Sequence, residues 1–130
     1  MTVEWRSVVG WGQEEIDELR SIAYAYMRQG QMTLAHTFFE ALVVLQPNSL
    51  YDLRMLASLR DLLGDPAGAI EVYQQLLKNE PNDLFASIGL SKALLATGQR
   101  GPAMERLRLL STCANRLIAN DAQALLLAYA

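Results

Sequence analysis

The sequence has few of the residues that commonly form catalytic and metal sites, since its 130 residues include one histidine and one cysteine. No other histidine or cysteine stands at helical spacing from His36, and there is no glycine-rich phosphate loop. Because the lone Cys113 cannot form an internal disulfide, a reducing, cytoplasmic location is expected. We therefore predict a protein that is not an enzyme and that has no metal and no cofactor.

Charge and long apolar runs are scarce as well. Charged residues make up 19% of the chain and the net charge is −3, which argues against a nucleic-acid partner, since such a partner favours a basic face. The longest apolar run, residues 124–130, is far shorter than the roughly 20 residues of a membrane-spanning helix, so no membrane span is expected. Residues 1–6 do not join a basic segment to an apolar run, and no signal peptide is predicted.

What the chain has instead is an internal repeat. Three residue types recur at one constant interval, as Gly30, Gly64 and Gly98, as Ala35, Ala69 and Ala103, and as Pro47 and Pro81. This interval matches the period of about 34 residues that is typical of stacked helix–turn–helix units. The glycine ends the first helix of each unit, the small alanine lets the two helices pack closely, and the proline stops the second helix. A chain of this kind is expected to bind another polypeptide.

Apolar residues spaced three to four apart predict two amphipathic helices in each unit. These helices are expected at residues 14–29, 33–46, 50–63, 67–79, 84–97 and 101–114, with caps supplied by Asp65 and by the pairs 48–49 and 82–83. The predicted fold class is all-α, a right-handed α-solenoid of three helix pairs plus a C-terminal helix. We expect one domain over residues 1–130, with an N-terminal segment at 1–13, repeats at 16–49, 50–83 and 84–117, and a terminal helix at 118–130.

These residues resemble the tetratricopeptide repeat family over about residues 16–115. The period, the helix-ending glycines, the alanines and the unit-closing prolines all coincide with the family pattern. Two departures stand out. The tyrosine of repeat position 11 is present as Tyr26 but is replaced by Arg60 and Leu94, and the third unit closes with Asn115 in place of proline.

In this family, positions 2, 5, 9 and 12 of each first helix line a concave wall, so the resemblance implies a groove for a client polypeptide. An apolar strip with a few donors suits an extended or helical segment with buried anchor side chains. We expect Tyr24, Tyr51 and Phe85 to be the anchors, with positively charged side chains binding polar groups of the client. The expected groove residues are Arg20, Tyr24, Met27, Tyr51, Arg54, Ser58, Phe85, Ile88, Lys92 and Leu95.

One known use of the family is not expected here. Co-chaperones that bind the acidic tail of heat-shock proteins resemble one another in a carboxylate clamp of lysine, arginine and asparagine side chains. At the clamp positions this chain has Arg20, Tyr24, Met55, Phe85 and Gly89, so at most one cationic contact is left. The sequence therefore does not predict an adaptor for heat-shock tails.

Residues 19–45 carry a narrower resemblance. The run LRSIAYAYMRQGQ from Leu19 and the run AHTFFEAL from Ala35 look like the small chaperones of bacterial type III secretion. Those proteins hold translocator, needle or export-gate subunits in the cytoplasm before secretion. The resemblance implies a non-catalytic chaperone for a secreted client. The alternative is an assembly adaptor or scaffold subunit of another multiprotein complex.

Both ends of the chain have many apolar side chains, although the end of a solenoid normally presents a polar face. Trp5 and Trp11 lie in the leading segment, and Leu126 and Tyr129 lie in the terminal helix, whose cap is predicted at residues 120–121. Consecutive helical residues step by about 100°, so the apolar side chains of this helix cannot all face inward. Either the ends fold back on the array, or they bind a second chain as a homodimer or as a second client contact.

Overall fold

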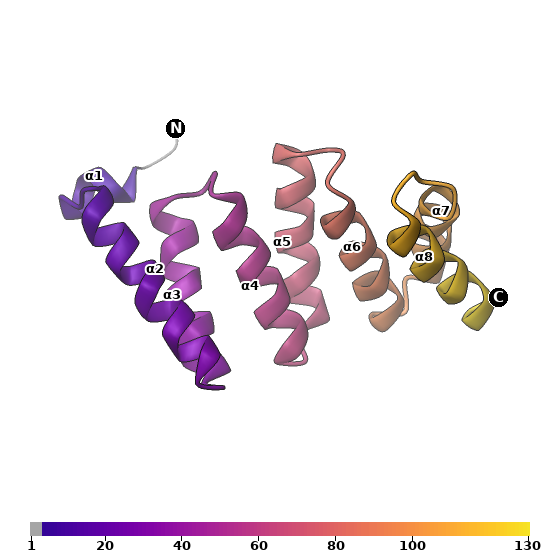
Figure 1. Ribbon diagram of the computed structural model, residues 1–130, viewed down its shortest axis with the longest axis horizontal. Helices are drawn as coiled ribbons and strands as arrows, with labels where there is room; N and C mark the ends of the chain where they lie inside the picture. Colours follow the sequence, from indigo (N-terminus) through magenta and orange to yellow (C-terminus); the bar gives the residue numbers. More distant parts are fainter. Residues whose placement is uncertain (1–3) are drawn as a thin grey trace. The chain divides into compact units, whose positions relative to one another are not determined.

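The computed structural model describes residues 4–130, and this range holds eight α-helices and no strand (Figure 1). The chain divides into two compact units, one ending at Gly64 and the other running from Asp65 to Ala130, and each is described by itself. The first unit contains α1 (Trp5–Val9), α2 (Gln13–Arg28), α3 (Met32–Leu45) and α4 (Leu50–Leu62). The second contains α5 (Pro66–Asn79), α6 (Leu84–Ala96), α7 (Arg100–Leu110) and α8 (Arg116–Ala128). The predicted all-α class is confirmed.

The three periodic glycines end helices, as their spacing predicts. Gly30, Gly64 and Gly98 have φ angles of 79°, 77° and 79°, a left-handed conformation that glycine adopts without the steric cost of a Cβ. The six helices that the repeat predicts begin and end within one residue of their expected bounds, apart from the end of α7. The periodic alanines are completely buried. The local signals therefore define these helix pairs correctly.

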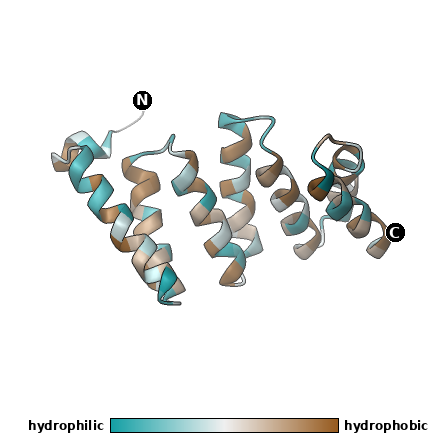
Figure 2. Cartoon of the chain, in the orientation of Figure 1, coloured by the Kyte–Doolittle hydropathy of each residue, from teal (hydrophilic) through white to brown (hydrophobic). Residues whose placement is uncertain are grey.

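The core of the first unit forms where α3 packs between α2 and α4. Phe39 and Leu42 of α3 are completely buried, as are Ile16 of α2 and Leu53 of α4. In Figure 2 the ribbon of α3 is largely hydrophobic, whereas α2 alternates between hydrophilic and hydrophobic residues. This difference follows from position, because α3 has a neighbour on each side and α2 has one face toward solvent.

The core of the second unit joins α6, α7 and α8. Its cluster of buried side chains is Ile88, Met104, Leu107, Leu110 and Ala122, against which Leu84, Leu95, Ile118, Leu125 and Leu126 pack with part of their surface. Ala119 and Ala122 are the buried residues of α8. The small side chains allow this last helix to pack closely on α7.

Helix α8 corrects the expected start of the terminal helix. It begins at Arg116, two residues before the predicted bound, and Asn115 caps it: the side-chain oxygen accepts a hydrogen bond from the backbone N–H of Ile118 at 3.1 Å. The caps Ser49 and Asp83 follow the period of the repeat, but Asn115 comes two residues before the next place in that period. Asn115 stands where the other repeats have proline, and only asparagine offers a side-chain acceptor. The helix therefore starts early, and the cap predicted at residues 120–121 is wrong.

The N-terminal segment also contains a short helix that the sequence pattern did not predict. Helix α1 packs against α3 and ends at Val9, and the next residue, Gly10, has a φ of 70°. Two glycines so close to a five-residue helix leave no periodic apolar pattern to recognise. Residues 1–3 of the expected N-terminal segment lie outside the described residues.

Replacing Asn115 with alanine is expected to lower the free energy of unfolding by about 1 kcal/mol, because the first turn of α8 loses its side-chain cap. Urea unfolding followed by circular dichroism measures the change. Asn120→Ala is the matched control, since Asn120 is an exposed residue inside α8, where alanine is the better helix former. A loss at Asn120 equal to that at Asn115 would contradict this assignment of the cap.

Candidate functional site

In the first unit, the two predicted aromatic anchors are partly exposed. Tyr24 of α2 is 44% exposed and Tyr51, in the first turn of α4, is 42% exposed. The ring of Tyr51 lies edge-on to the buried ring of Phe39, with 6.2 Å between centroids and 60° between planes. The Arg28 guanidinium lies over the Tyr24 ring at 5.9 Å. Each anchor therefore has one side supported by the protein and another open to a partner.

The second unit repeats this aromatic arrangement one period further along the chain. Phe85, in the first turn of α6, is 39% exposed, and its ring lies edge-on to the buried ring of Tyr73 at 5.9 Å and 61°. The pair Tyr73 and Phe85 thus has nearly the geometry of Phe39 and Tyr51. At this repeat position, each unit supports a half-exposed aromatic ring on a buried one.

The environment of Tyr51 raises the pKa of its hydroxyl, which is neutral at physiological pH. Burial raises the pKa of the phenol above its usual range, and the nearby Tyr24 and Asp52 raise it further, while Arg20 acts in the opposite direction. A neutral hydroxyl remains a hydrogen-bond donor as well as an acceptor. Tyr51 can therefore offer both an apolar ring and a donor to a bound chain.

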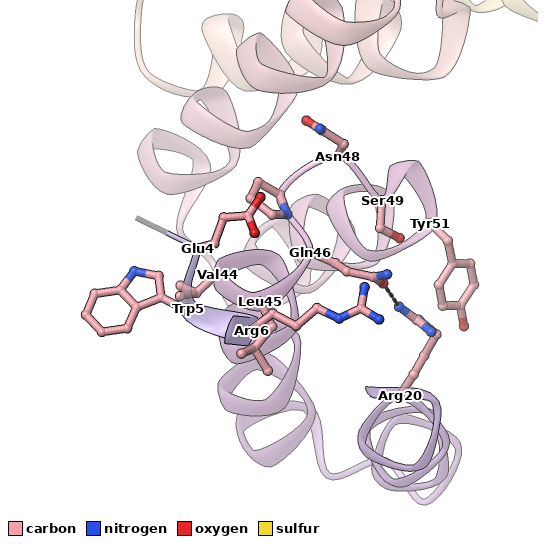
Figure 3. Close-up of a pocket in the computed structure, with 11 residues that line it drawn as sticks. Glu4, Trp5, Arg6, Arg20, Val44, Leu45, Gln46, Asn48, Ser49 and Tyr51 are labelled. Carbon is pink, nitrogen blue, oxygen red and sulfur yellow. Dashed lines mark hydrogen bonds between the residues drawn. The ribbon is translucent and has the colours of Figure 1, made fainter. Parts of the chain in front are cut away.

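Arg20 is surrounded by acceptors of its own protein. Its Nε and Nη2 atoms donate to the two carboxylate oxygens of Asp52 at 2.8 and 2.9 Å. Nη2 also donates to the side chain of Gln46 at 2.7 Å, and Nη1 donates to Asp17 at 2.9 Å. Figure 3 shows the bond to Gln46 at the edge of a pocket, with Tyr51 beside it. Asp52 is completely buried, and its hydrogen bond with Arg20 raises the pKa of the guanidinium further above its already high usual value.

That pocket, of about 1020 Å³, lies wholly within the first unit. Residues before and within α1 line one side, and the end of α3 with the loop to α4 lines the other. In Figure 3 the Arg6 guanidinium points toward Gln46, whereas the indole of Trp5 points away from it. The sequence pattern missed this pocket because it depends on α1. The available signal was Trp5, which precedes the first repeat and is one of the residues that line the pocket.

The other predicted groove residues are placed unequally. In the first unit Arg54 is exposed, and Met27 and Ser58 are half-buried. In the second unit Lys92 is exposed and pairs with Asp121 at 3.2 Å, while Leu95 packs with part of its surface against the core. Ile88 is only 6% exposed and belongs to the core cluster, so its contribution is to packing within α6 and α7.

The apolar residues predicted at the ends fall into two groups. Trp5, Trp11 and Tyr129 are 48%, 37% and 45% exposed. Leu126, by contrast, packs against the core of the second unit, while its neighbour Leu127 is 82% exposed. The backbone carbonyl of Tyr129 accepts two hydrogen bonds from Arg100 at the start of α7. The C-terminal helix is thus tied to α7 and still leaves apolar surface outside.

His36 and Arg60 join α3 to α4. The Nε of Arg60 donates to the Nε2 of His36 at 3.3 Å, and Glu40 lies within 3.4 Å of both side chains. This cluster between the two helices explains why Arg60 stands at the repeat position where the family has tyrosine.

Among residues 4–130, no three histidine, cysteine or acidic side chains are grouped so as to hold a metal ion. No helix in the same range is both long and apolar enough to span a membrane.

Solved structures of three proteins resemble this chain closely in fold. The type III secretion chaperone SycD of Yersinia enterocolitica, in complex with a peptide of the translocator YopD, is 22% identical with a TM-score of 0.80, and the match covers 91% of this chain and 94% of SycD. PcrH of Pseudomonas aeruginosa, in complex with the chaperone-binding region of PopD, is 21% identical with a TM-score of 0.77 and coverages of 92% and 94%. The first repeat domain of Spaghetti (RPAP3), bound to an HSP90 peptide, is 17% identical with a TM-score of 0.75 and coverages of 91% and 92%.

A comparison with curated proteins found no match. The family model of the tetratricopeptide repeat matches residues 62–129, which is more than half of the chain. The match adds the region after Asn115 to the repeats that the sequence pattern recognised. This chain belongs to the tetratricopeptide repeat family.

Proposed function

We propose that this chain is a non-catalytic, cytoplasmic chaperone that holds a type III secretion client polypeptide before export. The observation that carries the proposal is the repeated aromatic pair, in which Tyr51 and Phe85 are each half-exposed on a buried ring. Aromatic side chains held in this way bind apolar anchors of a partner at a low cost in conformational entropy. Two proteins of the same fold are complexed with segments of other proteins: SycD with a peptide of the translocator YopD, and PcrH with the chaperone-binding region of PopD.

The proposed client is an extended or helical segment with apolar anchor side chains. Tyr24 and Met27 would contact it in the first unit, and Leu95 in the second. Arg54 and Lys92 are exposed and would attract polar or acidic groups of the client. The ion pair of Lys92 with Asp121 lies on the surface, so opening it costs little.

Co-expression with the proteins encoded beside this chain tests the proposal. We expect one secreted polypeptide to co-purify with the wild-type chain and to aggregate when expressed without it. Fractionation after secretion then separates the two candidate functions. A chaperone remains in the cytoplasm, whereas an adaptor or scaffold subunit stays as a stoichiometric part of a finished complex. Turnover of a small molecule by the purified chain would contradict both.

We also propose that the apolar side chains left outside at the ends mediate self-association, most simply as a two-fold dimer. Replacing Leu127 and Tyr129 with lysine and serine is expected to convert the dimer to a monomer in light scattering. The test changes Leu127 and leaves Leu126 in place, because Leu126 packs against the core of the second unit. Leu62→Lys is the control, since Leu62 is 68% exposed at the end of α4. A wild-type chain that is monomeric at tens of micromolar excludes the dimer.

A further inference from the structure

We propose that Arg20 is a positioning residue, which together with Asp52 holds the first turn of α4 so that the ring of Tyr51 faces the client beside Tyr24. The proposal rests on the proposed function only in taking Tyr24 and Tyr51 as client anchors. It changes the role of Arg20, which its repeat position alone would place among the side chains that contact the client.

The hydrogen-bonding capacity of Arg20 is nearly filled by its own protein. A guanidinium has five N–H donors, and four of them are used by Asp52, Gln46 and Asp17. The two bonds to Asp52 form a bidentate pair, which fixes direction as well as distance. Only one N–H, on Nη1, is left for a partner. Arg20 is therefore poorly suited to bind a client carboxylate and well suited to bind Asp52.

Asp52 depends on this pairing because its side chain is completely buried. A buried carboxylate without its counter-charge is strongly unfavourable, so α4 must lie where Asp52 meets Arg20. The cap strengthens the constraint, since the backbone N–H of Asp52 donates to the hydroxyl of Ser49 at 3.4 Å. Tyr51 precedes Asp52 in the same turn, and consecutive side chains on a helix point about 100° apart. Fixing the direction of Asp52 therefore fixes the direction of Tyr51.

Gln46 brings the end of α3 into the same network. It accepts a hydrogen bond from Arg20 at 2.7 Å and donates one to Gln13 of α2 at 3.2 Å. The network thus joins α2, α4 and the end of α3 at the base of Tyr51, as Figure 3 shows for Arg20 and Gln46. The buried Phe39 of α3 supports the Tyr51 ring from within the unit.

The repeat itself provides a comparison. Arg54 follows Arg20 by one period of the repeat, but the residue one period after Asp52 is Ala86. The side chain of Arg20 is 22% exposed, whereas Arg54 is exposed. The sequence therefore repeats the arginine but not the aspartate that pairs with it in the first unit. Arg54 is the matched control for Arg20 in a measurement of the Tyr51 ring.

Asp52→Asn separates positioning from direct contact. If Arg20 contacted the client, removing the Asp52 charge would release the guanidinium, and binding would be unchanged or tighter. If Arg20 positions Tyr51, the variant binds more weakly, by about tenfold. The probe is the fluorophore-labelled polypeptide recovered by co-purification. Arg20→Lys keeps the charge but cannot form the bidentate pair, so positioning predicts a similar loss. Arg108→Lys, at an exposed position of α7 outside the predicted groove, changes affinity by less than about twofold.

A second measurement needs no client. In wild-type chain with ¹³C-labelled aromatic rings, nuclear Overhauser contacts are expected between the rings of Tyr51 and Phe39. These contacts weaken in Asp52→Asn and in Arg20→Lys, and they persist in Arg54→Lys. In a Tyr51→Ala background, Asp52→Asn produces no further loss of client affinity. Unchanged ring contacts in both folded variants, or unchanged or tighter binding by Asp52→Asn, overturns the proposal. Failure to recover any client contradicts the proposed function and leaves the ring measurement as the test of positioning.

Discussion

Replacing Gly89 with alanine is expected to lower the free energy of unfolding by about 2–3 kcal/mol. An alanine Cβ at this position would lie 2.4 Å from Cζ and 2.7 Å from the hydroxyl oxygen of Tyr73, well inside van der Waals contact. Gly89 and Tyr73 are both buried, so the ring has no open space into which it can move. This expected loss of stability is opposite in sign to the usual effect of a glycine-to-alanine change, because alanine normally stabilises a helix by up to about 1 kcal/mol relative to glycine.

Urea unfolding measures this change, and the chain offers a matched control. Gly101, near the start of α7, has no atom within 4 Å of the place that an added Cβ would occupy, so Gly101→Ala is expected to be neutral or slightly stabilising. Adding Tyr73→Leu to Gly89→Ala removes the clashing ring atoms and is expected to recover part of the loss. Equal stability of the Gly89 and Gly101 variants would show that the contact with Tyr73 does not limit the packing of α6.

Replacing Tyr51 or Phe85 with alanine is expected to weaken client binding by at least about 2 kcal/mol, roughly 30-fold, if each ring is an anchor of the interface. Both rings are about 40% exposed, so most of the expected effect falls on binding rather than on folding. Isothermal titration with the co-purified polypeptide measures the affinity, and circular dichroism verifies the fold. Leu62→Ala, at an exposed position outside the predicted strip on α4, is the control and should bind normally.

The two variants also test whether both units take part. Loss of binding in Tyr51→Ala alone would restrict the site to the first unit, and loss in Phe85→Ala alone would restrict it to the second. Normal affinity in both folded variants would show that the predicted groove positions are not the binding site.

The helix pairs were predictable from the sequence because their signals are local. A glycine with positive φ, such as Gly64, ends a helix through its own backbone preference. A side-chain cap such as Asp83 acts within three residues of its position. The constant period then repeats these signals along the chain, so six helices could be located without knowledge of any long-range contact. The half-exposed aromatic positions followed from the same repeat.

The remaining features depend on residues far apart in the chain. Arg20 and Arg54 are equivalent in the repeat, and only the tertiary structure brings Arg20 against Asp52, 32 residues away. Tertiary packing also decides that Leu126 lies against the core while Leu127 faces outward. It likewise explains Gly89, because the ring of Tyr73 lies so close that it leaves no room for a Cβ. Periodicity assigns each residue to a place within its repeat. Which partner fills the neighbouring space is decided by packing, because a side chain's burial and hydrogen bonds come from whatever residue the fold brings next to it.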